Sequence, residues 1–186
     1  MRHSNPNLSN NIPVDRIDGV RIALEPFGDQ FVSGKYLAWL RDEETSRYLV
    51  KGGASVTWND MENFSTSMQE SSCDYFFAIL DLQSDQHIGN VRLGPIDWEL
   101  GESGFGLMIG DANYRGKGIG REVMELIERV AFSLLGLARL KFPVVEENMV
   151  ALKMYAKSGY RRAGFSGEEF RKDGRSLPVT MLVKDR

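Results

Sequence analysis

Residues 105–120 read FGLMIGDANYRGKGIG, and the fold is best inferred from this stretch outward. Its first half is apolar enough for a strand, and Gly116, Gly118 and Gly120 then stand at alternate positions before a helix begins. Glycines allow a turn in which successive N–H groups point inward, and a helix N-terminus adds unpaired donors and the positive end of its dipole. The stretch therefore predicts a loop that binds a phosphate group.

Two other phosphate loops fit this stretch poorly. The nucleoside-triphosphate loop needs Gly-Lys followed by Ser or Thr, whereas Lys117 is followed by Gly118. The dinucleotide loop needs Gly-x-Gly-x-x-Gly in a βαβ unit, whereas these glycines are spaced Gly-x-Gly-x-Gly after a meander of strand-like segments. For the loop taken alone, a glycine-rich turn that only closes a tight connection stays open as an alternative.

Hydrophobic periodicity on both sides of the loop predicts a mixture of strands and helices. The helix after the loop carries an apolar stripe that includes Ile119 and Leu134, and it ends near Gly136. Strands are expected at residues 20–27, 75–82, 87–93, 105–110, 139–145, 160–170 and 177–183, and further helices at 30–41, 57–69 and 148–159. Connecting stretches are expected at 94–103 and at the turn 172–175.

The order βααβββαβαββ predicts an α/β (α+β) fold. Its centre is a twisted, mostly antiparallel sheet of about seven strands, covered by about four helices. We expect a flexible polar tail at residues 1–12 and a single domain at 13–186, because no change of composition divides the chain.

Composition limits the classes of function. The net charge is −3, so no overall basic field is available for a nucleic-acid backbone, and no nucleic-acid partner is expected. The longest nearly apolar run, 130–138, is shorter than the roughly 20 residues that cross a bilayer, so no membrane association is expected. The single cysteine, Cys73, and a polar start without a signal-peptide core favour a cytoplasmic protein.

Two segments together resemble a known family. Arg115-x-x-Gly118-x-Gly120 resembles the first signature of the GNAT superfamily of N-acetyltransferases, and residues 148–160, NMVALKMYAKSGY, resemble its second, an Asn-started helix with a Tyr before Lys-x-Gly-aromatic. The resemblance extends over the element order from Val20 to Val183. It implies a GNAT-like fold and an acetyltransferase (acyltransferase) that takes acetyl-CoA as its acetyl donor and needs no metal.

The resemblance also implies where the cofactor binds. Backbone groups of one strand would hold the pantetheine arm, the loop would hold the pyrophosphate, and the arm would insert between two strands that splay apart. Asn148 would touch the arm, although a role as the cap of its helix is at least as plausible. The implied cofactor-binding residues are Met108, Ile109, Gly110, Arg115, Gly116, Lys117, Gly118, Ile119, Gly120, Arg121 and Asn148.

The catalytic residues follow from the same resemblance. Tyr155 matches the family's usual general acid, which would meet the departing thiolate, and its alternative role is a core aromatic. An alkylamine must lose a proton before it attacks, so a base or a water chain is needed. We favour Glu102 narrowly over Glu99 as that base, with solvated surface as the alternative for each. The expected mechanism is direct attack of the amine in a ternary complex.

The acceptor is less well defined than the donor. The opening segments and residues 104–110 resemble the branch that contains ribosomal-protein N-terminal acetyltransferases, which implies a protein N-terminal amine. Residues 36–42, together with 87–91 and 94–96, resemble more loosely relatives that act on amino sugars. A noncatalytic acyl-CoA sensor or interaction module is the alternative function. We expect a monomer or a homodimer.

Overall fold

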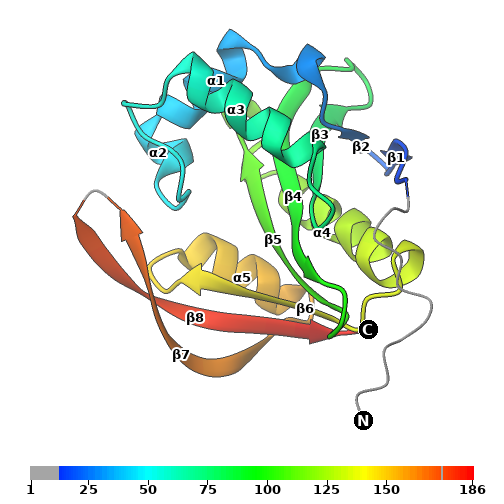
Figure 1. Cartoon of the computed structure of the whole chain (residues 1–186), viewed down its shortest axis with the longest axis vertical. Coiled ribbons are helices and arrows are strands. Elements are labelled where there is room, and N and C mark those ends of the chain that lie inside the picture. The colour runs from blue at the N-terminus through cyan, green and yellow to red at the C-terminus, as the bar shows by residue number, and fades with distance from the viewer. Residues whose placement is uncertain (1–12, 173) are drawn as a thin grey trace.

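One eight-stranded sheet organises the chain in the computed structural model, which describes residues 13–172 and 174–186 (Figure 1). Neighbouring strands run antiparallel except for β5 and β6, in the spatial order β1-β2-β3-β4-β5-β6-β8-β7. The strands are β1 (Ile17–Asp18), β2 (Ile22–Pro26), β3 (Tyr75–Asp81), β4 (His87–Asp97), β5 (Glu102–Ile109), β6 (Arg139–Val145), β7 (Arg161–Lys172) and β8 (Arg175–Asp185). The predicted fold class is confirmed, and the two-residue β1 is the strand that periodicity did not indicate.

Helices connect these strands in the predicted order. Within the described residues they are α1 (Gly34–Arg41), α2 (Glu43–Ser46), α3 (Trp58–Gln69), α4 (Ile119–Glu128) and α5 (Met149–Lys157), with short 3₁₀ turns η1 (Asp29–Phe31) and η2 (Ala112–Tyr114) and a π-helical end to α4, η3 (Arg129–Leu134). α1 begins later than predicted because residues 29–31 form η1 and Ser33 caps the helix. The extra helix α2 is a single turn that Asp42 caps.

The two faces of the sheet bury different side chains. In β3, Phe77 and Ile79 join a core that α4 and α5 complete, whereas Ala78 and Leu80 join a second core with residues of α1 and α3. This alternation is the two-residue period of a strand that is covered on both faces. Figure 1 shows α3 crossing one face of the sheet while α4 lies behind it.

The prediction that residues 94–103 form one connecting stretch is wrong. β4 continues through Pro95 to Asp97, and β5 already begins at Glu102. A proline within a strand-like run favours a strand end, but the pairing of β4 with β5 shifts register between Leu93 and Ile96. Such a bulge accommodates a residue that has no N–H to donate.

β5 and β6 diverge soon after they meet. Only Glu102 pairs with Arg139 and Ser103 with Leu140, in parallel, before the strands separate (Figure 1). Beyond these two pairs, β5 keeps its partner β4 and β6 keeps its partner β8. The sheet therefore opens along the middle, as the family resemblance implied.

Some expectations concern residues that the structure does not describe. Residues 1–12, expected to form a flexible tail, and Asp173 of the expected turn lie outside the described residues. Across residues 13–172 and 174–186, no helix is both long and apolar enough to cross a membrane. The cytoplasmic location and the division into tail and domain stay predictions.

Candidate active site

The glycine-rich loop presents a row of free backbone donors at the start of α4. Gly116 and Gly118 adopt left-handed φ values of 70° and 80°, which glycine reaches without strain. Gly118 is the N-cap of α4 and supplies no side-chain cap. In the part of the chain that the structure describes, the N–H groups of residues 116–121 donate to no protein acceptor. Six successive donors at a helix N-terminus form a site for an anionic group.

Arg21 and Glu122 hold this loop in place. Arg21 Nη1 donates to the carbonyl of Lys117 at 2.9 Å, and Arg21 Nε donates to Glu122 Oε2 at 2.9 Å. Glu122 Oε1 also accepts the backbone N–H groups of Val20 and Arg21. Burial tends to raise the pKa of Glu122, but these hydrogen bonds outweigh it and lower that pKa below its ordinary value. Because the Lys117 carbonyl is engaged by Arg21, it is not turned toward the free donors.

Arg115 donates its hydrogen bonds to other residues of the protein. Its backbone N–H donates to the carbonyl of Ala112, and its guanidinium donates to the carbonyls of Ile109 and Gly110 at 3.0 and 2.9 Å. The same guanidinium donates to Thr45 Oγ1 of α2 at 2.6 Å. The side chain of this signature arginine thus joins the end of β5 to α2, and it supports the loop from behind.

The remaining loop residues differ in what they expose. Ile119 is buried in the core, so it offers only its backbone N–H. Lys117 lines a cavity of about 720 Å³ together with Arg21 and Asp111. Arg121 is exposed and pairs with Glu125 one turn further along α4.

The three predicted residues at the end of β5 differ in their burial and in their backbone hydrogen bonds. The N–H of Gly110 donates to the carbonyl of Ile88, and its own carbonyl accepts from Arg115. Met108 is buried in the second core, and Ile109 packs beside the first. Because β6 has already separated, the β6-facing edge of β5 is unpaired along Met108 and Ile109.

Two residues of the second signature lie on α5. Asn148 caps this helix, since its Oδ1 accepts the N–H of Ala151 at 3.1 Å, which confirms the capping role. Tyr155 is 7% exposed, and its ring lies 5.7 Å from that of Phe105 and 5.0 Å from that of Phe142. Burial raises the pKa of Tyr155 above its ordinary value. The phenol therefore stays protonated at neutral pH, as a proton donor must.

The two predicted carboxylates lie at the closed end of the opening. Glu102 begins β5, and its Oε1 accepts from Arg139 Nη1 at 2.9 Å. Glu99 is exposed in the turn that connects β4 to β5. Glu102 precedes Phe105 by three residues, about 10 Å along a strand, so its carboxylate lies beyond direct reach of a group held beside Tyr155.

Comparison with known proteins identifies this arrangement. A sequence model of the acetyltransferase (GNAT) domain matches residues 21–161, most of the chain. The chain belongs to the GNAT acetyltransferase family. The matched residues include both signatures and the diverging strands β5 and β6.

Named relatives and solved structures agree with this assignment. Human alpha/beta-tubulin-N-acetyltransferase 9 is 25% identical over 161 residues, which cover 80% of this chain and 76% of the relative. An N-acetyltransferase 9-like protein of Caenorhabditis briggsae is 27% identical over 143 residues, 71% of each chain. Spermidine N-acetyltransferase from Vibrio cholerae, solved with CoA and spermine, superposes with a TM-score of 0.79 at 20% identity over 89% of this chain and 95% of that one. The chain is therefore an acetyl-CoA-dependent acetyltransferase of the GNAT fold.

Sequence reasoning missed the residues that support the GNAT loop from a distance. Arg21 and Glu122 are 101 positions apart, and Thr45 and Arg115 are 70 positions apart. One signal was available, since Glu122 lies on the apolar stripe of α4, where a carboxylate requires partners.

Proposed function

We propose that this protein transfers the acetyl group of acetyl-CoA to a primary amine by direct attack, with the pyrophosphate held by the loop before α4. The row of six free N–H groups at residues 116–121 carries this proposal. Neutral backbone donors in succession at a helix N-terminus suit an anion whose charge is spread over several oxygens. Lys117 and Arg121 add positive charge beside them, while Arg115 and Arg21 hold the backbone that presents them.

The pantetheine arm would lie along the open edge of β5. By the alternation of the antiparallel ladder, Met108 turns its backbone groups toward β4, so Ile109 is the residue whose backbone N–H faces the open edge, while its carbonyl accepts from Arg115. Gly110 marks the point where the edge turns into the loop. Asn148 stands at the start of α5, and its cap uses its Oδ1; among the described residues its amide nitrogen has no acceptor, so it is available to the arm. An extended arm on this edge would place its thioester end toward Phe105 and therefore near Tyr155.

Tyr155 is proposed as the general acid. The thiolate that departs from acetyl-CoA has a pKa near 8.5, so full transfer of a proton from a buried phenol runs uphill. A hydrogen bond to the sulfur as its charge develops already stabilises the transition state and needs no complete transfer. No covalent intermediate is required, because the amine attacks the thioester carbonyl itself.

The proton of the amine leaves through water in this proposal. Glu102 lies too far from Phe105 for direct contact and is held by Arg139, so it serves as the end of a water chain. Glu99 is the weaker candidate because it is exposed in the turn.

A protein amine is the acceptor that we favour. The tubulin N-acetyltransferase is matched over 80% of this chain, which supports a protein substrate, and the resemblance to ribosomal-protein N-terminal acetyltransferases points the same way. An amino sugar is the second candidate, from the looser resemblance of residues 36–42, 87–91 and 94–96.

The test is release of CoA thiol from acetyl-CoA with a panel of amines, namely N-terminal peptides, amino sugars and polyamines. Acetyl-CoA binding is measured separately by calorimetry. We expect tight binding and amine-dependent thiol release with at least one class. Tight binding without release on any amine would favour a noncatalytic acyl-CoA sensor, and absence of binding would contradict the loop assignment itself.

A further inference from the structure

The sheet face opposite Tyr155 is open beside the expected position of the thioester. Phe105 and Leu107 of β5 point to the face that α5 covers, so Gly106 between them faces the other side. A Cβ built on Gly106 would meet no heavy atom within 4 Å. An acceptor amine can therefore approach over Gly106, on the side of the sheet away from the proposed acid.

Arg92 lies next to Gly106 on this open face of the sheet. It pairs with Gly106 across β4 and β5, and its neighbours Val91 and Leu93 point into the opposite core. Arg92 therefore rises from the same face as Gly106, one strand away from the open edge of β5. Its side chain is 35% exposed.

Asp74 fixes the Arg92 guanidinium. Arg92 Nε donates to Asp74 Oδ1 at 2.7 Å, and the carboxylate is only 6% exposed. Asp74 Oδ2 is itself held by Ser71 Oγ at 2.7 Å. Within the described residues, Arg92 Nη1 has no hydrogen-bond acceptor. A guanidinium that is anchored on one side and free on the other is already oriented for a second anion.

We propose that Arg92 binds a carboxylate that the acceptor carries close to its reactive amine. The inference rests on the proposed function, since it names the acceptor class of the same site. Planar guanidinium donors match the two oxygens of a carboxylate, and Asp74 has already offset much of the cost of ordering the arginine side chain. The cationic groups of a polyamine are donors only, so they would leave Arg92 Nη1 without an acceptor.

The experiment compares acceptors that differ only in this charge. One pair consists of peptides that share their first residue and carry glutamate or glutamine second, and the other of glucosamine and its 6-carboxyl analogue, with spermidine as a cationic acceptor. For the wild type we expect a KM about tenfold lower for the carboxylate member of at least one pair, since hydrogen bonds to charged groups have this strength. Arg92→Gln should remove the preference and leave kcat for the neutral member within about twofold. Arg92→Lys should retain part of the preference for the carboxylate-bearing acceptor.

Controls separate binding from folding. Arg92→Gln leaves the Asp74 carboxylate buried without its partner, so the double variant Arg92→Gln/Asp74→Asn removes both charges together, and thermal unfolding is followed for each protein. Arg16→Gln is the matched control, because Arg16 is also ion-paired but lies beside β1 at the edge of the sheet.

Four outcomes decide the question. A preference that Arg92→Gln and the folded double variant both remove supports the inference. Equal KM values within both pairs for the wild type contradict it, as does preferred turnover of spermidine, and either result leaves the proposed acetyltransferase function standing. Failure to acetylate any amine while CoA binds contradicts the proposed function and the inference with it.

Discussion

The loop before α4 and the open face around Gly106 lie on adjoining parts of the molecule but are built differently. The loop is proposed to bind with backbone N–H groups from six consecutive residues, so the residues that determine its chemistry lie in one short glycine-rich stretch. The open face depends on side chains from separate elements, with Asp74 ahead of β3 holding Arg92 on β4. A site made of local backbone can bind the same acetyl donor in every relative. A site made of side chains from distant segments can differ between relatives that acetylate different amines.

Tyr155, which is proposed to act where the two regions meet, is expected to give the largest effect. Tyr155→Phe removes only the hydroxyl, so kcat should fall by about 100- to 1000-fold while acetyl-CoA affinity stays within about twofold. Thiol release and calorimetry measure the two quantities. Tyr160→Phe is the matched control, because Tyr160 is buried in the same aromatic cluster, with its ring 5.7 Å from that of Tyr155, and its hydroxyl lies beside Glu128. Equal loss in both variants would mean that packing, not the Tyr155 proton, is responsible.

The next effect tests the backbone character of the loop. Gly118→Asp places a negative charge beside the free donors and should weaken acetyl-CoA binding by about 100-fold. Gly136→Asp imposes similar left-handed strain, at φ 71°, near the other end of the helix and should lower stability without changing affinity. A folded Gly118→Asp protein with wild-type affinity would remove the loop from the cofactor site.

A smaller effect is expected at Glu122, which holds the loop without facing the ligand. Glu122→Gln should weaken acetyl-CoA binding about tenfold and cost about 1–3 kcal/mol of unfolding free energy. The exposed Glu125→Gln on the same helix should be nearly neutral. Because the folded pKa of Glu122 lies below its ordinary value of 4.5, its contribution to the free energy of unfolding is complete above pH 4.5 and is lost as the pH falls through the folded value. The free energies of unfolding of the wild type and of Glu122→Gln, measured by acid denaturation, should therefore converge at pH values below the folded pKa of Glu122.

The smallest effect is expected at Glu102 and Glu99, near the end where β5 and β6 still pair. Glu102→Gln should lower kcat about threefold if it ends a water chain, and Glu99→Gln should leave kcat unchanged. Steady-state rates at saturating acceptor check both. A loss of 100-fold in Glu102→Gln would make Glu102 a direct base, and no loss would leave water alone as the proton's route.

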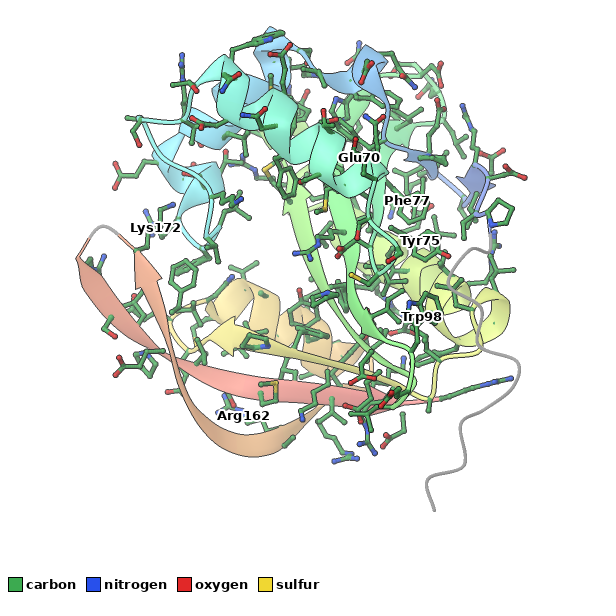
Figure 2. The ribbon with its side chains drawn as sticks, in the orientation of Figure 1. Glu70, Tyr75, Phe77, Trp98, Arg162 and Lys172 are labelled. Carbon is green, nitrogen blue, oxygen red and sulfur yellow. The ribbon has the colours of Figure 1, made fainter. Side chains whose placement is uncertain are left out.

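The parts that sequence predicted well are those whose signals are local. The glycine spacing at residues 116–120 and the apolar stripe of α4 are readable within one turn of the chain, and Asn148 was a cap by residue type alone. The bulge at Pro95 was missed because a proline marks either the end of a strand or a bulge, and only pairing with β5 decides between them. The bonds from Arg115 to Thr45 and from Lys172 to the carbonyl of Ser46 join segments far apart in sequence, so no local pattern predicts them. Figure 2 shows Lys172 at the end of β7, on the side toward α2.

The divergence of β5 and β6 has a consequence for handling the protein. Past Ser103 and Leu140, two strands in the middle of the sheet turn unpaired edges toward each other, and an extended chain of another molecule can add to either edge. Most sheets expose such edges only at their borders, where charges or bulges discourage aggregation. The proposed pantetheine arm would cover the edge of β5, so we expect protein prepared without acetyl-CoA to self-associate through this interior seam and solubility on storage to improve with the cofactor.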